Sequence, residues 1–481
     1  MNYRIVTSIV GRVLAIEAAL LLLPLATAAI YGESVMPFLW SVAITAVSAA
    51  LLCMFRPTTK EFYAREGFVS VALSWVTISL LGALPFVLSG EIPNYIDALF
   101  EIISGFTTTG SSVVPNVENL SRGILFWRSF SHWIGGMGVL VFMMAVLPMN
   151  EEYSMHLLRA EVPGPVKGKL VPKMRSTARI LYLIYIGLTI LLIILLVCGG
   201  MPVYDSIVHA FGTAGTGGFS IKATSIGWYQ SAYIDIVIGI FMVLFGINFN
   251  LYYMVLIRRS LKAFLNEELW FYLGIVAFAT VTIGLNISSQ YPSFLQSLRY
   301  SFFQVSSIIT TTGYATADFN RWPEYSRTML VALMFIGACA GSTGGGIKVS
   351  RFVLIIKSAS CEIMRQMFPR SVGRVTLDGE RVDDRTMHAA VVFFMLYIFT
   401  VFAGCILLSL EGLDFETTFT SVVTCLSNVG PGLSLVGPMG NFSVWSGGSK
   451  LVLCLCMLLG RLEIYPVIML FSPGIWKKGG R

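Results

Sequence analysis

Four short turns made mainly of threonine and glycine recur along the 481-residue chain, and each ends in a glycine. Neither side chain ionises near neutral pH, so the pattern does not predict acid–base chemistry. It predicts that main-chain carbonyl oxygens replace the hydration shell of a monovalent cation, because glycine reaches the dihedral angles that turn carbonyls toward one point. The turns are residues 105–110, 214–218, 309–313 and 426–430.

The candidate ion ligands are the last residues of each turn. A single turn of this kind is better explained as a helix end, but four in phase, each between apolar segments, favour an ion site. The fourth turn departs from the threonine pattern, so the predicted site is not truly fourfold. The candidates are Thr108, Thr109, Gly110, Thr216, Gly217, Gly218, Thr311, Thr312, Gly313, Asn428, Val429 and Gly430.

A short amphipathic segment precedes each turn and is too short to cross a membrane. We predict half-helices that enter the membrane from outside and point their partly negative C-terminal ends at the cation. Asp97 and Asp205 both stand 13 residues before the last glycine of a turn, which predicts that they cap these half-helices. The segments are residues 98–104, 206–211, 298–306 and 417–424.

The composition predicts an all-α polytopic membrane protein. Hydrophobic residues make up 56% of the chain and charged residues only 12%, which is too apolar for a soluble domain of this length. At about 20 apolar residues per span, the chain offers about ten spans. The spans expected after the four turns are residues 126–147, 232–257, 328–356 and 450–471.

Span, half-helix, turn and span form one repeated unit, which divides the chain. We predict a two-helix N-terminal extension at residues 1–66, pore repeat 1 at 67–150, pore repeat 2 at 151–262, pore repeat 3 at 263–360 and pore repeat 4 at 361–481. All four units enter from the same side, unlike the inverted halves of many solute transporters.

The positive charges predict the orientation of the chain. Twenty-three Lys and Arg residues fall in the loops on one side and seven on the other, which predicts that both termini are cytoplasmic. This distribution is a topology signal and does not predict nucleic-acid binding. The opposite side is rich in carboxylates, which would concentrate cations at a pore mouth, although acidic residues are also simply tolerated outside.

Residues 337–348 interrupt the expected second span of repeat 3 with five glycines. Each glycine costs a helix about 1 kcal/mol relative to alanine, so we predict an intramembrane loop that acts as a gate below the ion site. The alternative is a small-residue packing face, since Gly337 and Gly341 are spaced as in helix pairs. The candidate gate residues are Gly341, Ser342, Thr343, Gly344, Gly345, Gly346, Lys348 and Arg461.

Arg461 belongs to this set because of its depth. It lies eleven residues after Lys450, which at 1.5 Å per residue is roughly 16 Å into a helix. A guanidinium there is a functional hypothesis by default. Facing the pore, it would form an electrostatic barrier to cations; the alternative is an ion pair with another helix, because Glu463 points to a different face.

The whole chain resembles the TrkH-type subunits of the TrkH/TrkG/KtrB superfamily of potassium transporters. Besides the four turns, the motifs that carry the resemblance are FWR at 126–128, WIGGMG at 133–138, GSTGGGIK at 341–348 and GRLE at 460–463. Two extra spans, residues 5–31 and 38–55, resemble the TrkH branch rather than the shorter KtrB branch.

The resemblance implies a pseudo-fourfold pore within one subunit, a homodimer in the lipid of the bacterial plasma (inner) membrane, and control by a cytosolic ring of nucleotide-binding TrkA-type subunits. It implies K⁺ as the transported ion, with no organic cofactor, and favours K⁺ over Na⁺ because Gly110 is not serine. A less selective K⁺/Na⁺ channel or a cation-coupled symporter is the alternative. A membrane-embedded enzyme is disfavoured because the chain has no cluster of His, Asp or Cys residues with catalytic spacing.

Overall fold

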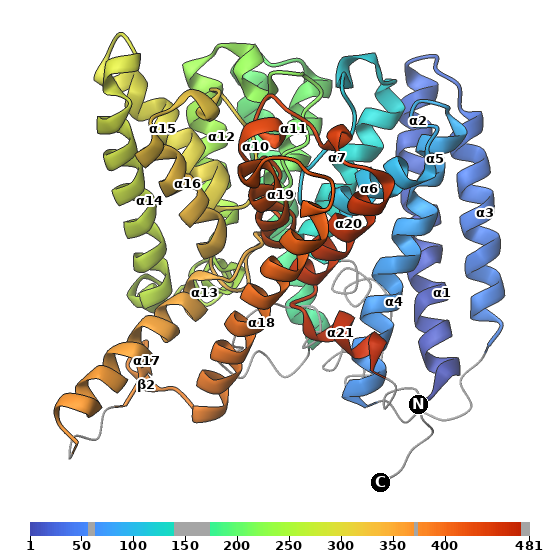
Figure 1. Ribbon diagram of the computed structural model, residues 1–481. Coiled ribbons are helices and arrows are strands. Elements are labelled where there is room, and N and C mark those ends of the chain that lie inside the picture. Colours follow the sequence, from blue (N-terminus) through green and yellow to red (C-terminus); the bar gives the residue numbers. More distant parts are fainter. Residues whose placement is uncertain (56–62, 139–173, 370–373, 473–481) are drawn as a thin grey trace.

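The protein is a bundle of α-helices (Figure 1). The computed structural model describes residues 1–55, 63–138, 174–369 and 374–472. Within them, six helices are long and apolar enough to cross a membrane, and one sharply bent pair makes a seventh candidate. Residues 139–147 of the expected span, the basic segment 159–173 and the basic end 477–481 lie outside the described residues.

The N-terminal extension is a helical hairpin beside the rest of the bundle. Helices α1 (Tyr3–Leu20) and α2 (Leu22–Ile30) run on as one apolar span, and α3 (Met36–Cys53) returns. Helix α1 packs against α3 and against α4. Gly11 allows this close approach, because a Cβ there would meet the backbone of Cys53 at 3.0 Å.

The first pore region begins with α4 (Ala64–Gly82) and α5 (Leu84–Leu88), which together form a span. Short helix α6 (Tyr95–Phe106) then leads to the first turn, and α7 (Arg122–Gly136) follows it. The second region repeats this order with α10 (Met174–Cys198) and α11 (Val203–Gly215).

After the second turn, α12 (Ala232–Phe245) and α13 (Phe249–Leu256) meet at an angle of 90°. A short 3₁₀ turn, Ser225–Tyr229, connects the turn to α12. Similar 3₁₀ turns lie in the loops after the other three turns, at Val117–Asn119, Phe319–Arg321 and Ser434–Val436.

The third region contains α14 (Glu267–Asn286), α15 (Phe294–Ile309) and α16 (Glu324–Ile336). Helix α16 ends where the glycines begin, and α17 (Val349–Met367) starts after them. The predicted break in this span is therefore present. In Figure 1, α17 extends below the bundle, away from the pore helices.

The fourth region follows a two-stranded hairpin, β1 (Thr376–Leu377) and β2 (Glu380–Arg381), which is the exception to an all-helical fold among the described residues. Its helices are α18 (Asp384–Ser409), α19 (Phe415–Ser427), α20 (Gly447–Arg461) and α21 (Tyr465–Phe471).

Two of the predicted second spans, residues 232–257 and 450–471, are interrupted and do not form continuous helices. Besides the break in region 3, α12 and α13 are separated by a bend, and α20 and α21 by a turn in which Glu463 and Ile464 have φ of 57° and 67°. Hydropathy does not register such breaks, because the residues on both sides are apolar. Local signals were present in Gly246, Asn248 and Pro466, which favour helix ends and starts.

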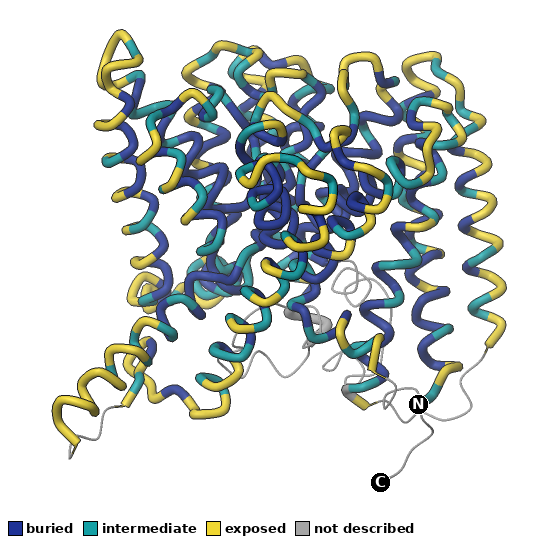
Figure 2. The backbone as a smooth tube through the Cα atoms, viewed as in Figure 1, coloured by how far each residue is buried: buried dark blue, intermediate teal, exposed yellow. Residues whose placement is uncertain are grey.

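The four short helices before the turns form the buried centre of the bundle. Figure 2 shows buried residues gathered in the middle and exposed residues on the outer faces of the peripheral helices. In α19, ten of the eleven residues from Thr417 to Ser427 are buried, all but Phe419, and several of them are threonines and serines. So much buried polarity indicates that these helices serve more than packing.

Candidate ion site and gate

All four short helices end in the same backbone motif. The amide of the second or third residue after each helix donates to a carbonyl five residues earlier, from Thr109 to Ser104 at 2.9 Å and from Gly217 to Gly212 at 2.8 Å. The same bond joins Thr312 to Ser307 at 2.8 Å and Val429 to Thr424 at 2.9 Å. This is the Schellman closure, which needs a left-handed residue just before the donor.

Glycine normally occupies that left-handed position, but this chain has other residues there. Thr108, Thr216, Thr311 and Asn428 have φ of 56°, 54°, 60° and 56°. A β-branched residue with positive φ is a genuine outlier, and such strain of about 1–3 kcal/mol persists only where the surroundings fix the conformation. Three threonine outliers at equivalent positions, with Asn428 in the same conformation at the fourth, indicate a functional constraint on the backbone.

The glycines that end the turns bring the four repeats into a closed ring. Gly110, Gly218, Gly313 and Gly430 all have positive φ, from 74° to 103°. A Cβ on Gly110 would overlap the carbonyl oxygen of Gly217, and the next two glycines meet the following repeats in the same way. A Cβ on Gly430 would lie 2.7 Å from the carbonyl oxygen of Thr109, which returns to the first repeat.

The ring therefore runs through the carbonyls of Thr109, Gly217, Thr312 and Val429. The twelve predicted ion ligands lie in the four turns that form this ring. Each carbonyl belongs to the residue before a glycine, so the four repeats contribute equivalent backbone positions despite their different side chains.

Most threonine hydroxyls in the turns bond to protein groups other than these four carbonyls. Thr107 Oγ1 donates to Ile103 O at 2.6 Å and lies 2.8 Å from Thr109 Oγ1. Thr310 and Thr312 repeat this arrangement with a separation of 2.8 Å. In the fourth turn, Asn428 Nδ2 donates to Thr109 Oγ1 at 3.0 Å, so the odd residue links two repeats.

The prediction that Asp97 and Asp205 cap the short helices was wrong. The side chain of Asn94 caps α6, and Asp97 lies in the first turn, where it accepts a hydrogen bond from Lys450 Nζ at 2.6 Å. Asp205 accepts from the Tyr229 hydroxyl at 2.6 Å. Both carboxylates still lie at helix N-termini, where negative charge is favourable, but their side chains tie α6 and α11 to neighbouring elements.

The outer loops beyond the turns also form a ring of contacts from one repeat to the next. Main-chain groups and short polar side chains make these bonds, so they fix backbone positions. They are Ala223 N to Glu118 Oε1 at 3.2 Å, Gly227 N to Ala315 O at 3.1 Å, Ser434 N to Asn320 Oδ1 at 3.1 Å, and Phe442 N to Ser112 O at 2.8 Å.

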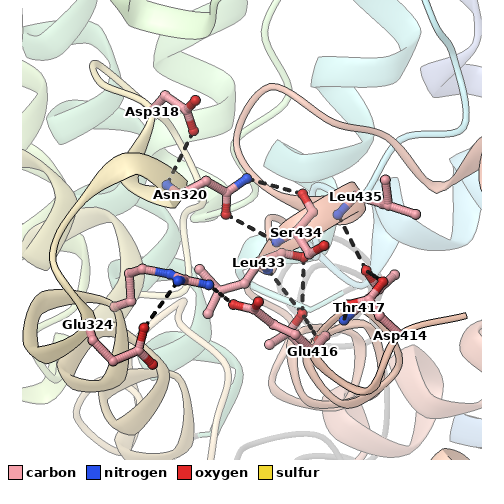
Figure 3. Close-up of polar contacts among 11 residues, drawn as sticks. Asp318, Asn320, Glu324, Asp414, Glu416, Thr417, Leu433, Ser434 and Leu435 are labelled. Atoms are coloured by element: carbon pink, nitrogen blue, oxygen red, sulfur yellow. Dashed lines mark hydrogen bonds and ion pairs between the residues drawn. The ribbon is translucent and has the colours of Figure 1, made fainter.

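Figure 3 shows the junction between the third and fourth repeats. Asn320 also donates from Nδ2 to Ser434 O at 3.1 Å, so both ends of its amide bond to one residue. Below it, Arg327 pairs with Glu416 and Glu324. Asp414 caps α19, and hydrogen bonds from Thr417 hold the pKa of its carboxyl below the usual value.

A polar cavity of about 160 Å³ lies over the ring, lined by all four turn glycines. The charged residues in its described lining are Arg128 and Lys222, and no carboxylate is among them. Outer carboxylates bind protein groups instead; for example, the buried Glu101 pairs with Arg128. The expected concentration of carboxylates at the pore mouth is thus not present in this lining.

The predicted gate loop lies directly against the turns of repeats 3 and 4. Gly345 N donates to Thr311 Oγ1 at 2.6 Å. A Cβ on Gly344 would meet Thr310 O at 2.9 Å, and one on Gly345 would overlap Ser427 O. The glycines are therefore needed for close approach as well as for breaking the helix.

The rest of the loop bonds to the bend between α12 and α13. Cys339 N donates to Gly246 O at 3.1 Å, Thr343 Oγ1 to Phe245 O at 3.2 Å, and Phe249 N to Gly341 O at 3.0 Å. The backbone groups that each broken helix frees are thus satisfied by the other, as burial at membrane depth requires. Lys348 Nζ donates to Gly344 O within the loop, and Ser342 Oγ to Cys339 O at 2.6 Å.

Arg461 joins the loop to the first repeat. Its guanidinium donates to Thr343 O at 2.9 Å, to Gly136 O at 2.9 Å and to Gly135 O. Glu463 points elsewhere, as expected, and pairs with Arg351 at 2.7 Å. These carbonyls hold the guanidinium, and with it a positive charge, close to the loop.

Sequence reasoning missed several residues that hold this assembly. His132 Nε2 accepts from Phe219 N at 3.3 Å, so its Nδ1 donates to Gly105 O at 2.8 Å, which joins the first and second turns. Glu268 accepts from Ala340 N at 2.6 Å. Neither has a local signal: a lone histidine or glutamate in an apolar stretch acquires its partners only in three dimensions.

Comparison with known proteins places this architecture in a family. Residues 35–478 match the family model for the TrkH cation transport protein. The chain is 36% identical to the Trk system potassium uptake protein TrkH of Salmonella typhimurium, with 99% of this chain and all of that protein covered. It is 35% identical to the potassium uptake protein TrkG of Escherichia coli, with 99% of each covered.

A solved structure agrees with this match. The crystal structure of the potassium transporter TrkH from Vibrio parahaemolyticus superposes with a TM-score of 0.89 and 31% sequence identity, covering 99% of this chain and all of that one. Full-length similarity in both sequence and fold leaves one reading: this polytopic, helical membrane chain belongs to the TrkH family of cation transport proteins.

Proposed function

We propose that this chain takes up potassium ions across the bacterial plasma membrane through one central pore, and that it is a transporter rather than an enzyme. The observation that carries the proposal is the closed ring of turns, in which the glycine of each repeat meets the carbonyl of the next. Related proteins over the full length are named as potassium uptake proteins, which supports K⁺ as the substrate.

The filter is built from the twelve predicted ligands, with the ring carbonyls replacing the water around the ion. Schellman closures and bonded hydroxyls fix the turns before an ion arrives. Preorganisation of this kind favours an ion whose size suits the ring. The four short helices add their partly negative C-terminal ends at the same place.

The gate is the loop of residues 337–348 together with Arg461. The loop lies against the turns, so an ion leaving the filter meets it, and Arg461 adds a positive charge that opposes cations. Opening requires the loop to release Thr311, the α12–α13 bend and Arg461.

Further parts of the proposal concern organisation and partners. The proposed repeats follow the order of helices described above, with the predicted boundaries at 66/67 and 360/361 falling inside α4 and α17. Cytoplasmic termini are consistent with Figure 1, in which the N-terminus and α21 lie toward the same face of the bundle. Exposed apolar side chains of α17, such as Ile363, Met364 and Met367, suit a homodimer contact. We also propose a cytosolic nucleotide-binding regulator of the TrkA type.

Ion flux into proteoliposomes tests the function. The purified chain and its Gly110→Ser variant are each reconstituted into proteoliposomes, and the uptake of K⁺, Rb⁺, Na⁺ and Li⁺ is measured. We expect K⁺ and Rb⁺ to pass well above Na⁺ and Li⁺ in the unmodified chain. Gly110→Ser should reduce that preference, because any Cβ there overlaps Gly217 O and deforms the ring.

The control is Gly187→Ser on α10, where an added Cβ meets nothing within 4 Å; it should retain normal selectivity. Equal Na⁺ and K⁺ flux in the unmodified chain would support the less selective channel instead. Flux that depends on a proton or sodium gradient would support the symporter.

A further inference from the structure

Glu268 is a buried carboxylate outside the filter and outside the predicted gate residues. It lies in the first turn of α14 with 5% of its surface exposed. One of its oxygens, Oε1, accepts two main-chain hydrogen bonds: Ala340 N at 2.6 Å and Ser350 N at 3.1 Å. Ala340 precedes the glycine-rich part of the gate loop and Ser350 follows it, so one oxygen atom joins the two ends of that part.

Ser350 N belongs to the first turn of α17, whose amides have no partner within the helix. The residue that precedes α17, Lys348, has φ of 82° and makes no side-chain cap. Its ammonium donates to Gly344 O instead. Glu268 therefore supplies, from another helix, the acceptor that a capping side chain would normally provide.

Ala340 N is the second donor, and it lies within the loop itself. Below it, main-chain bonds from Ile347 N to Phe335 O at 3.3 Å and from Lys348 N to Ile336 O at 3.0 Å close the base of the loop. These bonds fix only the base. The carboxylate connects the descending half of the loop to the helix after it, and both to α14.

We propose that Glu268 is a positioning residue that latches the gate loop in the conformation seen here, by capping α17 and holding Ala340 at the same time. The inference rests on the proposed gate function. Both hydrogen bonds to Glu268 Oε1 break when the loop moves away from α14. Release of the latch thus uncaps α17 in the same step.

The first test measures basal Rb⁺ flux of the purified chain in proteoliposomes without any regulator. Glu268→Ala should raise the flux by roughly tenfold, because loss of both bonds shifts a closed–open equilibrium. Glu268→Gln should behave as the unmodified chain, since its amide oxygen still accepts both bonds. Glu268→Asp should lie between them, because the shorter side chain cannot reach both donors, and it serves if the alanine variant does not fold.

Glu267→Gln is the matched control. Its carboxylate pairs with Lys357 at 2.5 Å, away from the gate loop. We expect its basal flux to be unchanged. A rise equal to that of Glu268→Ala would overturn the latch, because it would show that any disturbance of this helix end suffices.

The second test reads the loop directly through Cys339, a native loop residue that is 1% exposed. With every other cysteine replaced by serine, a small methanethiosulfonate reagent should label Cys339 faster in Glu268→Ala, and at the original rate in Glu268→Gln. Unchanged labelling in the alanine variant would overturn the proposal.

The two proposals fail in different ways. If no variant, including the unmodified chain, carries K⁺ or Rb⁺, the proposed function fails, while the labelling result still judges the latch. If the unmodified chain transports K⁺ but Glu268→Ala changes neither flux nor labelling, the latch alone fails.

Discussion

The four turns share one backbone conformation, whereas the ends of the helices that follow them, in the layer beneath, differ from repeat to repeat. In the turn layer, four different sequences adopt one backbone conformation and close one ring. Beneath it, the second helices stop at Gly136, Phe245, Ile336 and Arg461, but the chain continues differently in the three described cases: a bend, a long loop and a tight turn.

This difference between the two layers matches the two tasks proposed for them, which are to bind an ion and to block its path. An ion at the centre of a ring needs equivalent ligands from all sides, and these come from the backbone, so side chains are free to vary. Blocking a pore needs only one obstacle. Repeat 3 supplies the loop, repeat 2 supplies the bend that receives it, and repeat 4 supplies Arg461.

Glycines of the ring should give the largest effect. Gly218→Ala places a Cβ over Thr312 O, at a residue whose φ of 74° already disfavours alanine. We expect K⁺ flux in proteoliposomes to fall at least about tenfold, which corresponds to a rise of about 1.4 kcal/mol in the barrier to ion passage. Gly430→Ala should be milder, because its Cβ would lie 2.7 Å from Thr109 O. Gly274→Ala, with open space around it, is the control.

Equal losses of K⁺ flux in Gly218→Ala and Gly430→Ala would mean that the ring is as tightly packed at the fourth repeat as elsewhere. No loss at either would contradict the assignment of the ring as the ion site.

Arg461→Ala tests the lower layer and should act in the opposite direction. Removing the guanidinium frees Thr343 O and removes a positive charge near the path, so basal K⁺ flux should rise several-fold with K⁺ over Na⁺ preference retained. Flux measured with both ions checks this. Arg365→Ala, an exposed residue of α17, is the control; a fall in selectivity in Arg461→Ala would show that the layers are not separable.

Asn320→Ala should have the smallest effect and tests whether the outer ring of contacts supports the filter. The change removes two hydrogen bonds to Ser434, at a cost of about 1–3 kcal/mol. We expect a lower unfolding temperature and a slightly weaker preference for K⁺. Asn116→Ala, which removes a bond only to Glu118 N in its own loop, should leave the preference unchanged.

The turns could be predicted from sequence because their signal is local: a few residues set the helix end, the left-handed position and the glycine. The break at Gly337 was predictable for the same reason, since glycines are concentrated there. The gate and ligand roles remain predictions, and so do the repeat boundaries.

Long-range partners could not be predicted. Asp97 stands where a cap was expected, yet its carboxylate bonds to Lys450, far along the chain, while Asn94 caps the helix. The bend at Gly246 follows from bonds to a loop almost a hundred residues later. Hydropathy reports that these stretches are apolar, and it carries no information about which backbone groups a distant segment will satisfy.

The closing contact of the ring joins its first and last members, since Ser111 Oγ donates to Gly430 O at 3.0 Å across 319 residues. During synthesis the first three turns enter the membrane before the fourth exists. The ring therefore cannot close until nearly the whole chain has left the ribosome. Unfinished chains lack one side of the ring. Under the proposed function, the gate loop, which precedes the fourth turn in the sequence, is therefore made before the filter can form.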